Sequence, residues 1–376
     1  MGLRSGFRVV VTESYSDLTP LDELTPLIRT LDYSFARPGG AKELHCTVAT
    51  TIDHAWQYLQ ADLPGRHFKH IYVQEGPFLR WEGRIMEAGL SWGTTGVALA
   101  LKAFGYWSSC RDQRVAVVDY TGGSPTVDSI IKATLTAECP DISSTQDNIA
   151  AVAGTVNLTL PVDQYTQDVI LESLLPLGDS SDIKYDFWIE DGRVPFLKTR
   201  TLSQVDWEVR LQAIASGTIS QAAQHLRNGA DAYDGTTRQT SSSDADSQTL
   251  YPTRDAVVSV PAGTTGARAL DAQGAFLEER KDPQQQSRFV ITGKLTRTSG
   301  INRDWGGRSA IRAGQVLKVV DLLPRAVVSE ALDNIRTFYI RETKYDAMRD
   351  VVTVIPDRPA SSLAVILARQ GVELDR

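Results

Sequence analysis

The residues whose types could bind a metal are few and poorly spaced. His67 and His70 flank a Phe-Lys pair and are the clearest candidates for ligands. On a strand, positions three apart face opposite sides of the sheet, so these two imidazoles could not easily hold one ion. The other histidines, His45, His54 and His225, are scattered along the chain. We therefore predict no metal site, and a solvated or interface role for the segment around His67.

Pairs of carboxylates suggest a second chemistry, the hydrolysis of a glycosidic bond. Asp186 with Glu190, and Glu278 with Glu279, are the pairs to consider. That reaction needs two acids at a fixed separation in a rigid cleft, and a chain with 46 acidic residues contains such pairs by chance. The sequence also lacks the GxSxG, Walker-type, HExxH and GxGxxG motifs of other enzyme classes. We predict no catalytic residues and no cofactor.

Cysteine and tryptophan are more typical of structure than of chemistry in this chain. Cys46, Cys110 and Cys139 are widely spaced and odd in number, which argues against a disulfide framework or a zinc site. We expect three small buried apolar residues in a protein that folds in a reducing compartment. Trp81 and Trp188 lie within strand patterns and are predicted to anchor the core or a contact between modules. An aromatic platform for a carbohydrate is the alternative.

Length and composition indicate a folded protein of several modules. The chain has 376 residues, of which 42% are apolar and 23% charged, so two to four modules of roughly 100 residues are expected. We expect neither a membrane span nor a signal peptide, because no apolar run is long enough. The net charge of −7 argues against tight binding to nucleic acid. An acidic wall would instead let DNA slide past without sticking.

The first third of the chain is predicted to be rich in strands. Apolar residues alternate in residues 7–12 and 44–50, and Pro38-Gly39-Gly40 marks a turn between them. Residues 78–112 should contain two strands and a short apolar helix, although residues 97–104 fit either a helix or a buried strand. This segment is well organised and almost free of chemistry, which suggests a role in assembly.

The sequence changes character after the first third. A short buried strand is expected at 115–123, followed by a helix that begins after Thr126 and ends at Pro140. A second helix is expected at 167–179. These elements indicate a module that mixes helices and strands.

A hairpin with a clear turn signal closes this middle part. Its strands are expected at 185–190 and 193–200. Asp191-Gly192 indicates a type I′ turn, in which both central positions require positive φ. Pro195 has no N–H to donate, so its strand is expected at the edge of a sheet.

The last third returns to strands after a polar stretch. We expect a helix at 219–233, an exposed loop at 234–250 that cannot bury enough apolar area to become ordered, and a helix at 267–283. Several short strands follow, a pattern that suggests a barrel or a sandwich. They are expected at 288–298, 311–324, 337–346 and 350–356, before a closing apolar segment at 361–370.

The order of these segments resembles the hub protein of long-tailed phage tail tips, a family that includes the baseplate hub of contractile-tailed phages. The resemblance covers nearly the whole chain and rests on the order of its motifs. They are Pro38-Gly39-Gly40 with Trp81-Glu82-Gly83-Arg84-Ile85, Gly105-Tyr106 with Asp119-Tyr120 and the helix at 126–143, the Phe187-Trp188-Ile189 hairpin with Asp191-Gly192, and residues 311–316, 321–324 and 340–346.

The resemblance implies a fold of the α+β class that is mainly β, with two tail-tube-like β-barrel modules joined by an α+β module. Three chains would then offer six barrels in a pseudo-sixfold ring that matches the sixfold tail. The implied modules are a first β-barrel at 1–116, an α+β joining module at 117–204, a second β-barrel at 205–357 with a helix and a flexible loop near 234–249, and a C-terminal helix or tail at 358–376.

The implied function is structural: a tail-tip or baseplate hub, not an enzyme. As a homotrimeric ring it would join the tail tube to tip fibres or a spike and form or gate the DNA channel. Expected partners are a distal tail or tail tube protein, a tip fibre or central spike protein, and the tape measure protein. DNA would pass through the lumen without specific binding, and no membrane contact is expected.

The implied location is the tail tip of the virion, after assembly in the host cytoplasm. The chain ends at Arg376, soon after the implied second barrel. We therefore expect a lytic or receptor-binding function to belong to a partner protein.

Two alternatives stay open. The first is a tail-associated enzyme that degrades polysaccharide or peptidoglycan, which predicts acids clustered with Trp81, Trp188 or Trp305 in one cleft. The second is a hub in a related contractile injection machine rather than a virion. The sequence of one chain does not separate that machine from a phage.

Overall fold

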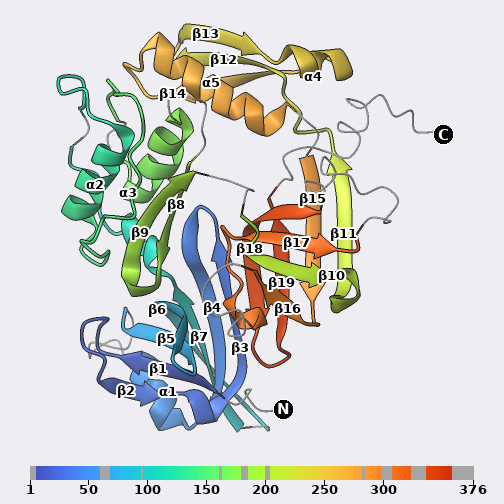
Figure 1. Cartoon of the computed structure of the whole chain (residues 1–376). Helices are drawn as coiled ribbons and strands as arrows, with labels where there is room; N and C mark the ends of the chain where they lie inside the picture. The colour runs from blue at the N-terminus through green and yellow to red at the C-terminus, as the bar shows by residue number, and fades with distance from the viewer. Residues whose placement is uncertain are drawn as a thin grey trace.

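The chain is shown in Figure 1 as a computed structural model, in which strands predominate. The mainly β class predicted from the sequence is therefore confirmed. The structure describes residues 6–59, 68–94, 96–117, 119–160, 163–178, 185–199, 204–281, 284–298, 307–322 and 336–357.

The first third folds into strands because its apolar residues alternate. Val9 and Val11 on one strand, and Leu44 and Cys46 on another, point into the same core. The strands are β1 (Phe7–Thr12), β2 (Pro20–Glu23), β3 (Ile28–Ala36), β4 (Gly39–Thr50), β5 (His70–Glu75), β6 (Phe78–Gly93) and β7 (Gly96–Phe104), with helix α1 (Ile52–Leu59) and 3₁₀ helices η1 (Thr25–Leu27) and η2 (Tyr106–Arg111).

Residues 97–104, which fit either a helix or a strand in sequence, are part of strand β7. They pair with β4 on one side and with β6 on the other. The short apolar helix expected within residues 78–112 is therefore wrong, and the 3₁₀ helix η2 that follows β7 is a different segment.

The middle third contains helix α2 and several short helical segments. Helix α2 buries Val127, Ile130, Ile131 and Leu135 on one face, as its spacing predicts, but the Thr126 side chain makes no capping hydrogen bond. The elements are α2 (Val127–Glu138), α3 (Thr166–Asp168), the π-helical η3 (Val169–Leu174), η4 (Leu175–Leu177), β8 (Tyr185–Glu190), η5 (Asp191–Arg193) and β9 (Val194–Thr199).

The buried strand predicted at 115–123 is wrong. The described residues of this segment form a single isolated bridge, between Asp119 and Thr159. Val115 is buried, but the Val117 side chain is 55% exposed. No named strand lies alongside to complete a ladder, and irregular segments provide the backbone partners instead.

The last third contains the remaining strands and two helices. Each predicted strand region from 288 onward contains a strand, and the helix predicted at 267–283 is α5. The elements are β10 (Trp207–Arg210), η6 (Leu211–Ala213), β11 (Ile214–Ala222), β12 (Gly229–Asp234), β13 (Thr237–Ser243), α4 (Ala245–Leu250), β14 (Asp255–Val260), α5 (Gly266–Arg280), β15 (Gln284–Ile291), β16 (Leu295–Arg297), η7 (Arg308–Ala310), β17 (Val316–Val320), β18 (Thr337–Asp346) and β19 (Val351–Pro356).

Two predictions for residues 219–250 are wrong. The segment 219–233, expected to be a helix, instead contains the end of β11 and most of β12, and the loop expected at 234–250 (flexible near 234–249) contains β13 and α4. Strands β13, β12 and β14 form a small sheet in that order, and α5 lies across one face of it (Figure 1). Pairing with β12 and cover from α5 order a segment whose own composition is too polar to order itself.

A single large sheet links the first and last thirds of the chain. Its main path runs β11-β15-β19-β18-β3-β4-β7-β6-β5-β1-β2. The link is the antiparallel pair β3 and β18, in which Tyr33 lies opposite Tyr345 and Phe35 opposite Thr343. Core residues of both thirds form one continuous cluster around this pair.

The two barrels implied by the resemblance are not confirmed. Neither sheet of the described residues closes on itself. The proposed module boundaries at residues 116, 204 and 357 stay predictions, and the C-terminal helix or tail at 358–376 lies outside the described residues. None of the described helices combines the length and apolar character that crossing a lipid bilayer would require.

Candidate functional site: a polar joint between three parts of the chain

The histidines considered as metal ligands do not form a site. His67 lies outside the described residues. His70 is buried in β5, where its Nδ1 lies 2.8 Å from the Tyr106 hydroxyl. Burial lowers the pKa of His70 to about 4, so its imidazole is neutral at neutral pH. Within the described ranges, no three potential metal ligands come together.

The carboxylates of the pair Asp186 and Glu190 have structural partners. Asp186 is buried and accepts a hydrogen bond from the Tyr339 hydroxyl. Glu190 accepts one from Trp188 Nε1 at 2.9 Å. Asp186 lines an apolar groove of about 280 Å³, whereas Glu190 lines a different and much smaller cavity. The two acids therefore do not share one cleft.

The two described tryptophans named for the enzyme alternative are covered. Trp81 is fully buried in the core, and its Nε1 has no hydrogen-bond partner among the described residues. Trp188 stacks on Phe196 with ring centres 5.3 Å apart, and the Arg37 guanidinium lies 3.8 Å from its ring centre. Trp305 lies outside the described residues. Neither described ring offers a free face for a sugar, so both serve as anchors.

The three cysteines are free and buried, as predicted. Cys46 belongs to the large core, and burial raises its pKa to about 12. Cys110 and Cys139 lie together in the core of the middle third, where burial also raises the pKa of Cys110. These thiols are packing residues with little thiolate character at Cys46 and Cys110.

The hairpin turn Asp191–Arg193 is the point at which three parts of the chain meet. Glu190 pairs with Val194, so the loop has three residues. Positive φ falls at Gly192 (74°) and Arg193 (62°). The type I′ turn predicted at Asp191-Gly192 is therefore wrong, because the extra residue moves the left-handed positions along by one. The edge position of the Pro195 strand is confirmed, since β9 pairs only with β8 among the named strands.

Glu82 of β6 binds this turn from the first third of the chain. Its Oε1 accepts hydrogen bonds from the backbone N–H groups of Gly192 at 2.7 Å and Arg193 at 3.1 Å. The side chain is almost fully buried. Burial, and then the nearby Asp191 carboxylate, raises the pKa of Glu82 to about 7.

Arg312 binds the same turn from the last third. Its guanidinium donates to both carboxylate oxygens of Asp191 at 2.9 Å and to the backbone oxygen of Leu79 at 3.1 Å. Burial alone would lower the pKa of Arg312, but the Asp191 carboxylate raises it. A bidentate fork of this kind fixes both direction and distance. We call Glu82, the turn Asp191–Arg193, Arg312 and Arg37 the joint.

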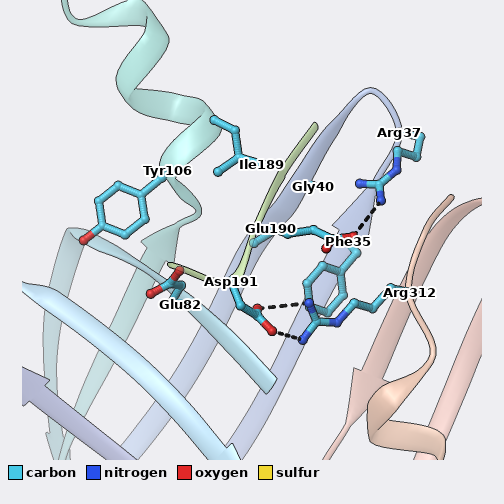
Figure 2. A pocket seen from close by; sticks show the side chains of 10 residues that line it. Phe35, Arg37, Gly40, Glu82, Tyr106, Ile189, Glu190, Asp191 and Arg312 are labelled. Atoms are coloured by element: carbon cyan, nitrogen blue, oxygen red, sulfur yellow. Dashed lines mark hydrogen bonds and ion pairs between the residues drawn. The ribbon is translucent and has the colours of Figure 1, made fainter. Parts of the chain in front are cut away.

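Arg37 completes the joint from the turn between β3 and β4. Its side chain is 5% exposed, and Nη2 lies 3.7 Å from Oε1 of Glu190. Burial lowers the pKa of Arg37 to about 10, so it stays charged at neutral pH. Figure 2 shows Arg37 and Arg312 converging on the hairpin from opposite sides of Phe35. Between these groups lies a cavity of about 10 Å³, close to the size of one water.

Loss of Arg312 should weaken the joint. We expect Arg312→Ala to reduce the free energy of unfolding by about 2 kcal/mol, because Asp191 and two backbone carbonyls lose their donor. The cost stays below that of a fully buried pair, since the Asp191 side chain is 39% exposed. The measurement is a urea unfolding curve. Arg349→Ala is the control, because that arginine is 78% exposed and also pairs with an aspartate; equal effects would contradict the role of Arg312.

Little in the sequence points to the joint. Arg80, Glu82 and Arg84 alternate with apolar residues on β6 and look like a solvated face, yet all three are buried. The usable signals are glycines at which a backbone must approach closely. A Cβ on Gly40 would lie 2.1 Å from the Ile189 oxygen, and a Cβ on Gly105 would overlap the backbone of Ala41.

The arrangement can hold parts of the chain together, and no group of three potential metal ligands accompanies it among the described residues. The hydrogen bonds and ion pairs of its charged groups are made to other parts of the same chain. These contacts fix the position and angle of the hairpin turn relative to the other two parts of the chain.

Comparison with known proteins gives matches in structure only. No protein-family model and no curated protein matches the sequence. A tail protein from Neisseria meningitidis MC58 matches with a TM-score of 0.65 and 12% identity, over 95% of this chain and 96% of that chain. The 43 kDa tail protein of prophage MuSo2 from Shewanella oneidensis matches with 0.61 and 9%, over 94% and 98%.

A third match comes from a related machine. An Escherichia coli component of the type VI secretion system, described as structurally similar to the T4 bacteriophage tail proteins gp27 and gp5, gives a TM-score of 0.52 and 10% identity, over 93% of this chain and 76% of that one. At these identities the likeness establishes the fold. The resemblance drawn from the sequence is confirmed at that level: the chain has the fold of phage tail proteins.

Proposed function

We propose that this chain is a structural hub of a phage tail tip or baseplate and works as a homotrimeric ring. The observation that carries the proposal is the match to a tail protein over 95% of this chain and 96% of the other. Each chain contributes two strand-rich thirds, so three copies would place six such units around the tail axis. That number matches a sixfold tube above the ring.

The proposed role is positional. The ring would join the tail tube to tip fibres or a central spike, and it would form or gate the channel for DNA. The joint would set the angle between the strand-rich thirds and the middle of the chain. A net charge of −7 suits a conduit that DNA must pass without sticking.

The proposed partners are those of a tail tip. They are other copies of the chain, a distal tail or tail tube protein, a tip fibre or spike protein, and the tape measure protein. The proposed location is the virion tail, after assembly in the host cytoplasm. The prophage origin of one matched structure favours a virion over a secretion machine.

A measurement of mass tests the proposal. Sedimentation velocity and native mass spectrometry should find a species of three times the 41.2 kDa of one chain. A ring should also bind purified tube or tip proteins from the same phage genome. A protein that stays monomeric at its highest soluble concentration, and that binds none of these proteins, would contradict the hub.

A further inference from the structure

At alternating positions, strand β6 presents a face of three charged side chains, all of them buried. Arg80 and Arg84 have carboxylate partners there, at 2.9 Å from Glu75 and 2.6 Å from Asp112. Glu82 lies between them and is also buried. Among the described residues, it accepts hydrogen bonds only from backbone N–H groups, and its one ion-pair neighbour is a histidine. It is therefore the member of this face whose charge is least compensated.

The two carboxyl oxygens of Glu82 have different surroundings. Oε1 accepts from Gly192 and Arg193, whereas Oε2 faces His70 Nε2 at 3.9 Å. The other ring nitrogen of His70 lies against the Tyr106 hydroxyl. A proton on Oε2 would leave both hydrogen bonds to the turn in place. The neutral acid can thus hold the turn without burying a charge.

Titratable groups face Glu82 from every side. Asp191 opposes its ionisation, while Arg193 and the two turn N–H groups favour it, and burial outweighs them all. The groups are His70 on β5, Arg84 on β6, Tyr106 on η2, Asp191 and Arg193 on the turn, and Arg312 beyond Asp191, with Asp112 and Asp141 bound to Arg84. Arg312 binds the Asp191 carboxylate, so this second contact to the turn remains when Glu82 ionises.

We propose that Glu82 is a proton-operated latch between the first third of the chain and the hairpin turn. In its neutral form it holds the turn through two backbone amides. In its ionised form it places a poorly compensated buried charge beside Asp191 and weakens the contact. The latch belongs to the single chain and does not rest on the proposed function.

The direction of the pH effect follows from the two states. Glu82 ionises near 4.5 in an unfolded chain and near 7 in the folded one. Its contribution to stability is therefore complete below 4.5 and is lost as the pH rises through about 7. His70 acts in the opposite direction, because its pKa falls from 6.5 to about 4 on folding. A variant that keeps His70 and removes only the Glu82 titration separates the two effects.

Glu82→Gln is that variant, because an amide oxygen can still accept from Gly192 and Arg193. We expect the unfolding constant of the unchanged protein, relative to E82Q, to rise on the order of fiftyfold between about pH 5 and about pH 8. Glu87→Gln on the same strand is the control, since Glu87 is 66% exposed. The unfolding constant of the unchanged protein relative to E87Q should not change with pH in that range. A constant ratio for E82Q would overturn the latch.

Two measurements do not depend on the folding of a variant. Infrared difference spectra with ¹³C-glutamate should show a protonated carboxyl at about pH 6 that ionises by about pH 8. Amide hydrogen exchange in a peptide spanning residues 188–196 should accelerate over the same pH range. The acceleration should exceed the increase in the intrinsic exchange rate that pH alone produces. The absence of a protonated glutamate at about pH 6 would overturn the proposal, whatever the fate of E82Q.

Discussion

Substitution of Gly40 by alanine is expected to destabilise the protein by roughly 4 kcal/mol, the sum of backbone strain and steric overlap. Gly40 lies opposite Ile189 where β4 meets β8. Its φ is 98°, and a Cβ at this position would be 2.1 Å from the Ile189 oxygen. To relieve this overlap, β8 must move away from β4. That movement also displaces the hairpin turn, which belongs to the joint. The measurement is the midpoint of urea unfolding at neutral pH.

Gly96→Ala is a matched control for this substitution. Gly96 has nearly the same φ, 102°, but its nearest neighbour to a new Cβ is an Arg29 nitrogen at 3.9 Å. It should therefore show only the conformational cost, about 1 to 2 kcal/mol. If the two variants lost equal stability, the close approach of β4 and β8 would not be what requires Gly40.

Truncation of Trp81 to alanine is expected to cost about 3 to 5 kcal/mol. The ring is fully buried in the large core. Its removal leaves a cavity that the surrounding sheet can only partly fill. Thermal or urea unfolding would measure the loss, and the far-ultraviolet circular dichroism of the folded variant should stay strand-rich.

Trp92→Ala tests the same residue type on the same strand in the opposite environment. Trp92 is 75% exposed near the end of β6, so its loss should change stability by less than about 0.5 kcal/mol. Comparable losses at the two tryptophans would show that Trp81 is not a core anchor.

Strands with a clear apolar rhythm could be predicted from the sequence. The alternation in β1 and β4 identifies both the strand and its buried face, because a period of two suits only an extended chain with one side covered. Helix α2 could be predicted for the matching reason, a spacing of three and four residues ended by Pro140. Local pattern and final environment agree in these elements.

Residues 219–250 could not be predicted because partners distant in sequence decide their structure. Ile219, Ala222, Ala223 and Leu226 are spaced as on one face of a helix, yet β11 pairs with β15 along its whole length. Strand β13 contains no apolar residue and owes its order to β12 beside it. Tertiary pairing overrides local preference in both cases.

The joint escaped prediction for a related reason. The order of segments pointed to the hairpin and to residues 311–316, but not to the contact between them. An alternation of charged and apolar residues normally indicates one solvated face, and nothing near Glu82 in sequence shows that a hairpin will cover it. The bidentate partner of Arg312 could be identified only once the fold had brought Asp191 beside it.

The pairing of β3 with β18 has a consequence for synthesis on the ribosome. Residues of β3 emerge from the ribosome well before the strand that completes their ladder, because the whole middle of the chain is made between them. Until then, the growing chain carries an unpaired strand edge of the kind that binds other chains. Nascent chains on one messenger would be prone to pair with one another, so protection of β3 by a chaperone should raise the yield of correctly folded protein.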